Sequence, residues 1–86
     1  MATVTAFRID GIELWFWSHD HEPPHFHAKK KGEWEYRVWF MEQPTAMLDR
    51  LWTQKRMPRS IRKQLVELAE SHRSELLQQW QQIQGM

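Results

Sequence analysis

The sequence of 86 residues has no cysteine, only three glycines and no long apolar run. Without cysteine the chain can form neither disulfides nor thiolate metal sites. Its fold must therefore be stabilised by packing, by a metal ion bound to His and carboxylate side chains, or by a partner chain. Without a long apolar run it cannot span a membrane, and its first residues have no signal-peptide core. We therefore expect a cytoplasmic protein that does not contact a membrane.

The sequence is rich in apolar and aromatic residues. Hydrophobic residues make up 41% of the chain, which contains six Trp, four Phe and one Tyr. This composition is too apolar for intrinsic disorder. No repeat, linker or low-complexity tract divides the chain, so residues 1–86 are predicted to form a single domain. A core of this size cannot easily bury six tryptophans.

Residues 1–57 have the pattern of a β meander with a histidine-rich loop. Strands are expected over residues 3–9, 12–17, 25–29 and 33–40. Every second residue from Trp34 to Phe40 is apolar or aromatic, which predicts one packed face and one solvated face for the last strand. Residues 46–52 fit either a further edge strand or one helical turn.

The second part of the chain has a helical period. From Pro58 onward, apolar residues recur every three or four positions. This spacing is typical of an amphipathic helix, and Pro58 and Gly85 suit its start and its end. We therefore predict one long amphipathic helix over residues 58–84. The expected fold class is α+β, with a small antiparallel sheet of three or four strands and this helix packed across it.

Four of the five histidines, His19, His21, His25 and His27, form two His-x-His pairs on either side of a Pro-Pro dipeptide. In an extended segment, residues two positions apart project to the same side, so His25 and His27 are expected to point together. The four imidazoles, with Asp20 in support, are candidate ligands for a divalent transition metal. Alternatively His25 or His27 acts as a catalytic general base, or the loop makes only structural hydrogen bonds.

His72 lies on the apolar stripe of the predicted helix, where a polar ring needs a hydrogen-bond partner. One interpretation is a satisfied core histidine, which we favour. The other is that His72 meets the loop histidines at the sheet edge. In that case its neighbour Arg73 would pair with Asp20 or Glu22, and His72 and Arg73 would both support the site.

The net charge of +1 hides an uneven distribution. Residues 1–49 hold five Lys and Arg against eight Asp and Glu, a balance of −3, and residues 50–86 hold seven against three, a balance of +4. Six basic residues follow one another with no acid between them: Arg50, Lys55, Arg56, Arg59, Arg62 and Lys63. This basic segment forms either an anion site for phosphate or nucleic acid, or a solvated face paired with Glu33, Glu35 and Glu42.

The tryptophans are expected to divide between core and surface. Trp34 is in phase with the packed strand face and Trp80 with the helix stripe, so both are predicted to be buried. Trp39 and Trp52 lie near the basic segment, where they would stack on a nucleic-acid base or anchor a protein interface. We favour the interface, because the chain has no Gly-rich phosphate loop and no recognition-helix signature.

The run from Asp20 to His27, Asp-His-Glu-Pro-Pro-His-Phe-His, and the segment from His72 to Trp80 resemble the family called domain of unknown function 4160. Pro58 also falls where such sequences open their helix. The resemblance covers nearly the whole chain, although residues 41–57 are longer and more basic than is typical. It implies a short bacterial α+β protein with no agreed biochemical function.

Genes of that family often sit beside a second small gene, so the resemblance implies a small partner protein encoded nearby. The leading hypothesis is that the protein is the protein-binding component of a two-gene, toxin–antitoxin-like module. A homo-oligomer of this chain is a further possibility. The alternative is a small His-dependent or metal-assisted nuclease. In that alternative His25 and His27 serve as base or ligands, His21 and Asp20 assist, and the basic segment holds the phosphates of a nucleic acid.

Overall fold

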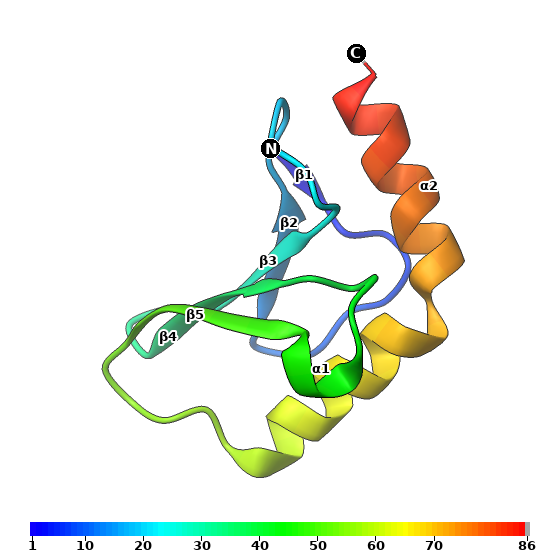
Figure 1. Cartoon of the computed structure of the whole chain (residues 1–86). Coiled ribbons are helices and arrows are strands. Elements are labelled where there is room, and N and C mark those ends of the chain that lie inside the picture. Colours follow the sequence, from blue (N-terminus) through cyan, green and yellow to red (C-terminus); the bar gives the residue numbers. More distant parts are fainter. Residues whose placement is uncertain (86) are drawn as a thin grey trace.

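The computed structural model describes residues 1–85, which form an α+β fold with an antiparallel sheet whose five strands pair in chain order. The strands are β1 (Ala2–Thr3), β2 (Glu13–Phe16), β3 (Phe26–Lys30), β4 (Trp34–Val38) and β5 (Leu48–Thr53). A 3-10 turn, η1 (Pro44–Ala46), precedes β5, and two helices, α1 (Arg59–Ser71) and α2 (Arg73–Gln84), follow it (Figure 1). The predicted fold class is confirmed, with five strands instead of three or four because residues 48–53 form β5 rather than a helical turn.

The first predicted strand, residues 3–9, is wrong in its extent. Only Ala2–Thr3 pairs with β2 as a strand. Beyond it the side chains do not alternate across a sheet, because the segment crosses towards the helices. The Phe7 ring packs against both Phe26 and His72, with ring centroids 6.0 and 5.5 Å away.

The predicted single C-terminal helix is interrupted at His72, whose backbone has φ −110° and ψ 21°. Immediately after this break, Arg73 Nε donates to the carbonyl oxygen of Phe40 at 2.7 Å. Arg73 Nη2 also donates to the carbonyl oxygen of Glu42. Arg73 therefore ties the start of α2 to the loop after β4, and the bend between the helices is visible in Figure 1.

The core lies between one face of the sheet and the two helices. Trp34, Val38 and Phe40 are fully buried, as the alternation along β4 predicted, and they share one apolar cluster with Leu65 of α1 and Trp80 of α2. The predicted burial of Trp34 and Trp80 is thus confirmed. Within residues 1–85, neither helix has the length and the apolar content needed to cross a membrane.

The other face of the sheet, here called the open face, carries the side chains that alternate with the core residues. Both helices pack on the opposite side. From β2 to β5 the open face presents Glu13, Trp15, His27, Lys29, Glu35, Arg37, Asp49 and Trp52. The candidate site is built on this face and on the loop at its end.

Candidate metal centre

The loop between β2 and β3, residues 17–25, brings a carboxylate to the end of the open face. His19 has a left-handed backbone, with φ 58°, a conformation in which His, Asn and Asp are enriched among non-glycine residues. Asp20 follows this reversal, and its side chain is only 16% exposed. The Glu22–Pro23 peptide bond is cis, and the chain then enters β3.

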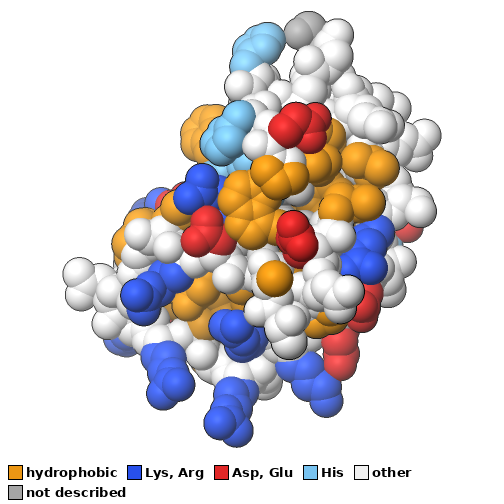
Figure 2. Space-filling model, in the orientation of Figure 1, with side chains coloured by type: hydrophobic (Ala, Val, Ile, Leu, Met, Phe, Trp, Pro, Cys, Tyr) orange, Lys and Arg blue, Asp and Glu red, His pale blue; other side chains and the backbone are white. Residues whose placement is uncertain are grey.

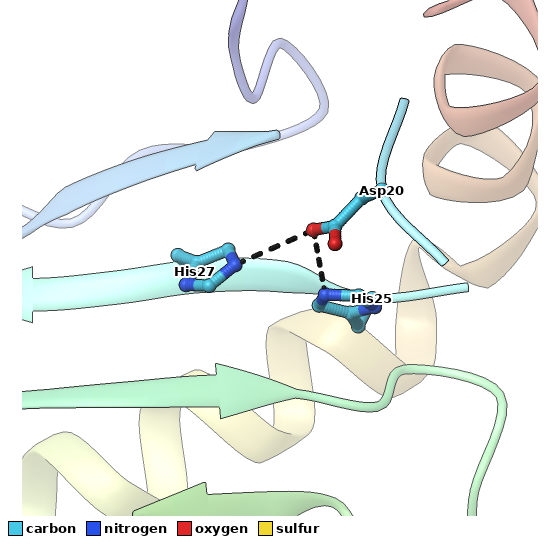
Figure 3. Close-up of side chains that lie close together, drawn as sticks. All are labelled: Asp20, His25 and His27. Atoms are coloured by element: carbon cyan, nitrogen blue, oxygen red, sulfur yellow. Dashed lines mark ion pairs between the residues drawn. The ribbon is translucent and has the colours of Figure 1, made fainter. Parts of the chain in front are cut away.

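Asp20 meets two histidines at the start of β3. His25 and His27 lie two positions apart and project to the same side, while Phe26 between them is fully buried in the core. Asp20 Oδ2 lies 2.8 Å from His25 Nε2 and 3.6 Å from His27 Nε2 (Figure 3). The ligand atoms of the three residues all lie within 4.8 Å of one another. The structure therefore brings together the two histidines that the alternation predicted to point together.

The contact between Asp20 and His25 needs a positive charge. His25 Nδ1 lies 2.9 Å from the carbonyl oxygen of Pro23, and because a carbonyl oxygen can only accept, Nδ1 carries the proton. His25 Nε2 then faces the carboxylate at ion-pair distance, but its geometry is not that of a hydrogen bond and it has no other partner in residues 1–85. Two electron-pair donors that approach to 2.8 Å repel each other unless a proton or a metal ion lies between them.

Tryptophan rings enclose both imidazoles. The His25 ring lies 4.5 Å from the ring of Trp39 and 5.4 Å from that of Trp80, and the His27 ring stacks on Trp15 at 5.3 Å. As a result the His25 side chain is fully buried and that of His27 is 10% exposed. Polar atoms in such an apolar enclosure are costly unless they find a partner.

A second carboxylate, that of Glu35 on β4, lies on the far side of the His27 ring. Glu35 Oε2 is 3.4 Å from His27 Nδ1, and Glu35 Oε1 accepts a hydrogen bond from Trp52 Nε1 at 3.3 Å. Burial, together with the proximity of His25, lowers the pKa of His27, although Asp20 and Glu35 act in the opposite direction. His27 is therefore neutral near pH 7, which is the form of imidazole that binds a metal ion.

Comparison with known proteins places the chain in a family. A family model described as a domain of unknown function, DUF4160, matches residues 11–81. The chain belongs to this family. The match confirms the resemblance seen in the sequence, and it contains every residue of the cluster around Asp20. No curated protein and no solved structure matches the chain.

Two further histidines of the DUF4160 loop lie outside the cluster. His21 is exposed, with Nδ1 3.3 Å from Asp20 Oδ1 and its ring 5.6 Å from that of His25. His19 is exposed as well, and in the described part of the chain it forms no ion pair. The structure thus groups Asp20 with two of the four histidines that the sequence offered as ligands.

The second interpretation of His72, in which it meets the loop histidines, is wrong. His72 Nδ1 lies 3.0 Å from Glu75 Oε1, so the half-buried ring has its own partner on α2. Arg73 does not pair with Asp20 or Glu22, because the break in the helix directs it to the carbonyl oxygens of the loop after β4. Arg73 ties the start of α2 to the loop after β4, and His72 contacts Glu75 and the Phe7 ring rather than the histidine cluster.

The basic segment is exposed and lacks the acidic partners that one interpretation gave it. Among residues 1–85, none of its six Lys and Arg side chains lies within ion-pair distance of a carboxylate. In Figure 2, most Lys and Arg gather along the lower edge, and one blue side chain lies beside the histidines at the upper left. Trp39 does not join this segment, because its ring packs on His25 and lies 5.4 Å from the Arg37 guanidinium. Trp52 is 37% exposed on β5.

Sequence reasoning missed Glu35 as part of the centre and placed it only among the acids facing the basic segment. Alternation along β4 puts Glu35 on the open face. Its proximity to His27 depends on the pairing of β4 with β3, in which Arg37 is directly opposite His27 and Glu35 is its diagonal neighbour. The observed register requires a three-residue loop, residues 31–33, because Lys30 pairs with Trp34. A two-residue turn at Lys31–Gly32, the turn that the sequence suggests, would have placed Tyr36 opposite His27 and Glu35 on the wrong face.

Proposed function

We propose that this protein binds one divalent transition-metal ion through Asp20, His25 and His27 and that it uses the ion for metal-assisted hydrolysis. The observation that carries the proposal is the approach of a buried, unpartnered His25 Nε2 to the Asp20 carboxylate, with His27 Nε2 beside them. Two imidazoles and one carboxylate suit Zn, Fe, Co, Ni or Cu, whereas Mg and Ca prefer oxygen ligands.

The distances between the ligand atoms support an ion of that size. With metal–ligand bonds of about 2.1 Å, neighbouring ligands of a tetrahedral zinc lie about 3.4 Å apart. Asp20 Oδ2 lies 2.8 Å from His25 Nε2 and 3.6 Å from His27 Nε2. The first distance is shorter than the separation expected around zinc, and the second is longer. Small rotations of the side chains would equalise the two distances.

The number of ligands favours chemistry over a purely structural role. Structural zinc sites are closed by four protein ligands, whereas catalytic sites have three and keep a position for water. A bound ion of this kind supplies a water with a pKa near 7 and polarises the bond to be cleaved. Asp20, His25 and His27 would hold the ion, and the enclosing tryptophans would limit access of other water molecules.

A nucleic acid is the substrate class that the charges support. The exposed basic segment offers Lys and Arg to phosphates. Most Lys and Arg in Figure 2 lie along the edge that is away from the histidines. A single small phosphate could not contact both regions, whereas a polymer could lie across them. We therefore propose a metal-assisted nuclease that acts on a nucleic-acid strand rather than on a free nucleotide.

Calorimetric titration of the metal-free protein with zinc and with nickel tests the metal site. We expect one ion per chain, and loss of binding in His25→Ala and His27→Ala. His19→Ala is the matched control, because this loop histidine is exposed and lies outside the cluster. A wild-type protein that binds neither metal would refute the proposal and leave Asp20 and His25 as an ion pair. A wild type that does not cleave single-stranded RNA would refute the nuclease activity alone, and cleavage that survives His25→Ala would show that this centre does not carry it.

We also propose, as a second function, that the protein binds a small partner protein through β5, in line with a two-gene, toxin–antitoxin-like module. Leu51 and Trp52 on this strand are 39% and 37% exposed. The outer edge of β5 pairs with no strand of residues 1–85, so its backbone groups are free to extend the sheet.

Co-expression with the product of the neighbouring gene tests this second function. We expect the two proteins to elute together in size-exclusion chromatography and Leu51→Asp to separate them. Met41→Asp is the control, since Met41 is 48% exposed but lies outside every strand. Separate elution of the wild-type proteins at every salt concentration would contradict the proposal, and elution of this chain alone at twice its mass would indicate a homo-oligomer instead.

A further inference from the structure

We propose that Glu35 is the positioning residue of the metal centre and that Trp52 holds it in place. In this arrangement Glu35 accepts the Nδ1–H of His27, so the His27 ring presents its unprotonated Nε2 to the ion. The inference rests on the proposed metal-binding function and adds to it the group that fixes the protonation pattern of one ligand.

The two imidazoles have matching surroundings. Nδ1 of His25 lies 2.9 Å from the carbonyl oxygen of Pro23, and Nδ1 of His27 lies 3.4 Å from Glu35 Oε2. In both rings the opposite nitrogen, Nε2, faces Asp20. Metal-binding histidines ordinarily donate their other N–H to a carboxylate or a carbonyl, and this donor bond sets the tautomer and the ring orientation.

His27 Nδ1 is buried. In the described structure this atom makes no hydrogen bond, and its 3.4 Å contact with Glu35 does not have the geometry of one. A buried N–H needs an acceptor, and Glu35 Oε2 is the acceptor within reach. A small reorientation of the His27 ring or of the Glu35 carboxylate would complete the bond, so the pair is placed to tighten when an ion fixes Nε2.

Glu35 cannot bind the same ion directly. Nδ1 and Nε2 point away from each other in the imidazole plane, so a group that contacts Nδ1 lies on the side of the ring opposite an ion held by Nε2. Glu35 is also held from behind, because Trp52, its cross-strand partner on β5, donates Nε1–H to Oε1 at 3.3 Å. Its side chain is only 18% exposed. Glu35 is therefore placed to orient His27 and not to act as a fourth ligand.

Substitutions at position 35 separate this role from a merely structural one. Glu35→Leu removes the acceptor, whereas Glu35→Gln keeps an acceptor oxygen without the charge. We expect zinc to bind roughly 10- to 100-fold more weakly to Glu35→Leu and to regain part of its affinity in Glu35→Gln. Trp52→Phe, which removes the donor that holds Glu35, should weaken binding less. Glu33→Leu is the matched control, a half-buried glutamate of the same hairpin that makes no side-chain hydrogen bond or ion pair within residues 1–85.

Nitrogen-15 NMR of the imidazoles provides a readout that does not depend on bound metal. In the metal-free wild type near pH 7, His27 should be the Nδ1–H tautomer, and Glu35→Leu should lose this preference while Glu33→Leu keeps it. A wild-type His27 that is mainly the Nε2–H tautomer would overturn the inference. Equal zinc affinity of Glu35→Leu and Glu33→Leu would overturn it too and leave the metal site standing. A wild type with the expected tautomer that binds no metal would instead refute the proposed function.

Discussion

Replacing Asp20 by asparagine should stabilise the metal-free protein and abolish its response to zinc. The substitution keeps the shape of the side chain but replaces one oxygen by an amide group with two N–H donors. These donors would face the Nε2 atoms of His25 and His27, which lie 2.8 and 3.6 Å from the present Oδ2. The remaining oxygen would still accept the backbone N–H of His21, now 3.1 Å from Oδ1.

The expected magnitude follows from the bonds gained. One or two new hydrogen bonds to buried acceptors contribute about 1–2 kcal/mol to the free energy of unfolding. In a chain of this length, about 1 kcal/mol corresponds to a rise in Tm of roughly 4–8 °C. Zinc at about 100 times its Kd should stabilise the wild type by about 2.7 kcal/mol. The amide oxygen of Asp20→Asn is a poor zinc ligand, so zinc should leave the variant nearly unchanged.

Thermal unfolding followed by tryptophan fluorescence, in EDTA and in excess zinc, measures both effects. We expect the variant to melt above the wild type in EDTA and below it in zinc, so that the order of stability reverses. Asp10→Asn is the control, because the Asp10 side chain is fully exposed. If Asp20→Asn melts below the wild type in EDTA, the carboxylate faces a protonated His25. The contact is then an ordinary ion pair, and the observation that carries the metal site is lost.

Three other predictions concern the helices, the core and the basic segment. Arg73→Ala should lower the free energy of unfolding in urea by about 2–3 kcal/mol, because a charged donor to two backbone carbonyls is lost; an equal loss in Arg8→Ala, whose side chain is 90% exposed, would contradict that role. Trp34→Ala should cost about 3–5 kcal/mol by the same assay, since it empties a fully buried site; a cost below about 1 kcal/mol would mean that the core around it collapses freely. If single-stranded RNA binds, the joint change Arg59→Gln and Arg62→Gln should reduce the slope of log affinity against log salt by about 1.4; an unchanged slope would place the RNA elsewhere.

The sequence predicted those parts of the fold that depend on local periodicity. The alternation from Trp34 to Phe40 correctly separated core from open face, because period two in a half-buried strand is enforced by the cost of burying charge. The helical period was also found, but not the break at His72, since the apolar stripe continues through it and the bond of Arg73 to Phe40 that follows it joins residues far apart in the sequence. A contact between residues more than 30 positions apart cannot be predicted from the spacing of neighbouring residues.

The candidate site was predictable to the same degree and for the same reason. His25 and His27 could be expected to point together, because they are neighbours in one extended segment. Their contact with Asp20 depends on a loop reversal at His19, and a positive φ at a non-glycine residue leaves no firm signal in a single sequence. The position of Glu35 depends in turn on the register between two strands.

The high tryptophan content has a physical explanation in the site as well as in the core. Trp15 and Trp39 pack on the two imidazoles and form an apolar enclosure outside the main core. These rings are large and rigid, so they hold His25 and His27 in fixed orientations at little entropic cost. They also exclude water, which lowers the pKa of His27 and makes a lone carboxylate at Asp20 expensive. An enclosure that keeps His27 neutral while burying the Asp20 carboxylate beside it needs a positive charge, which either a proton on His25 or a bound divalent cation would supply.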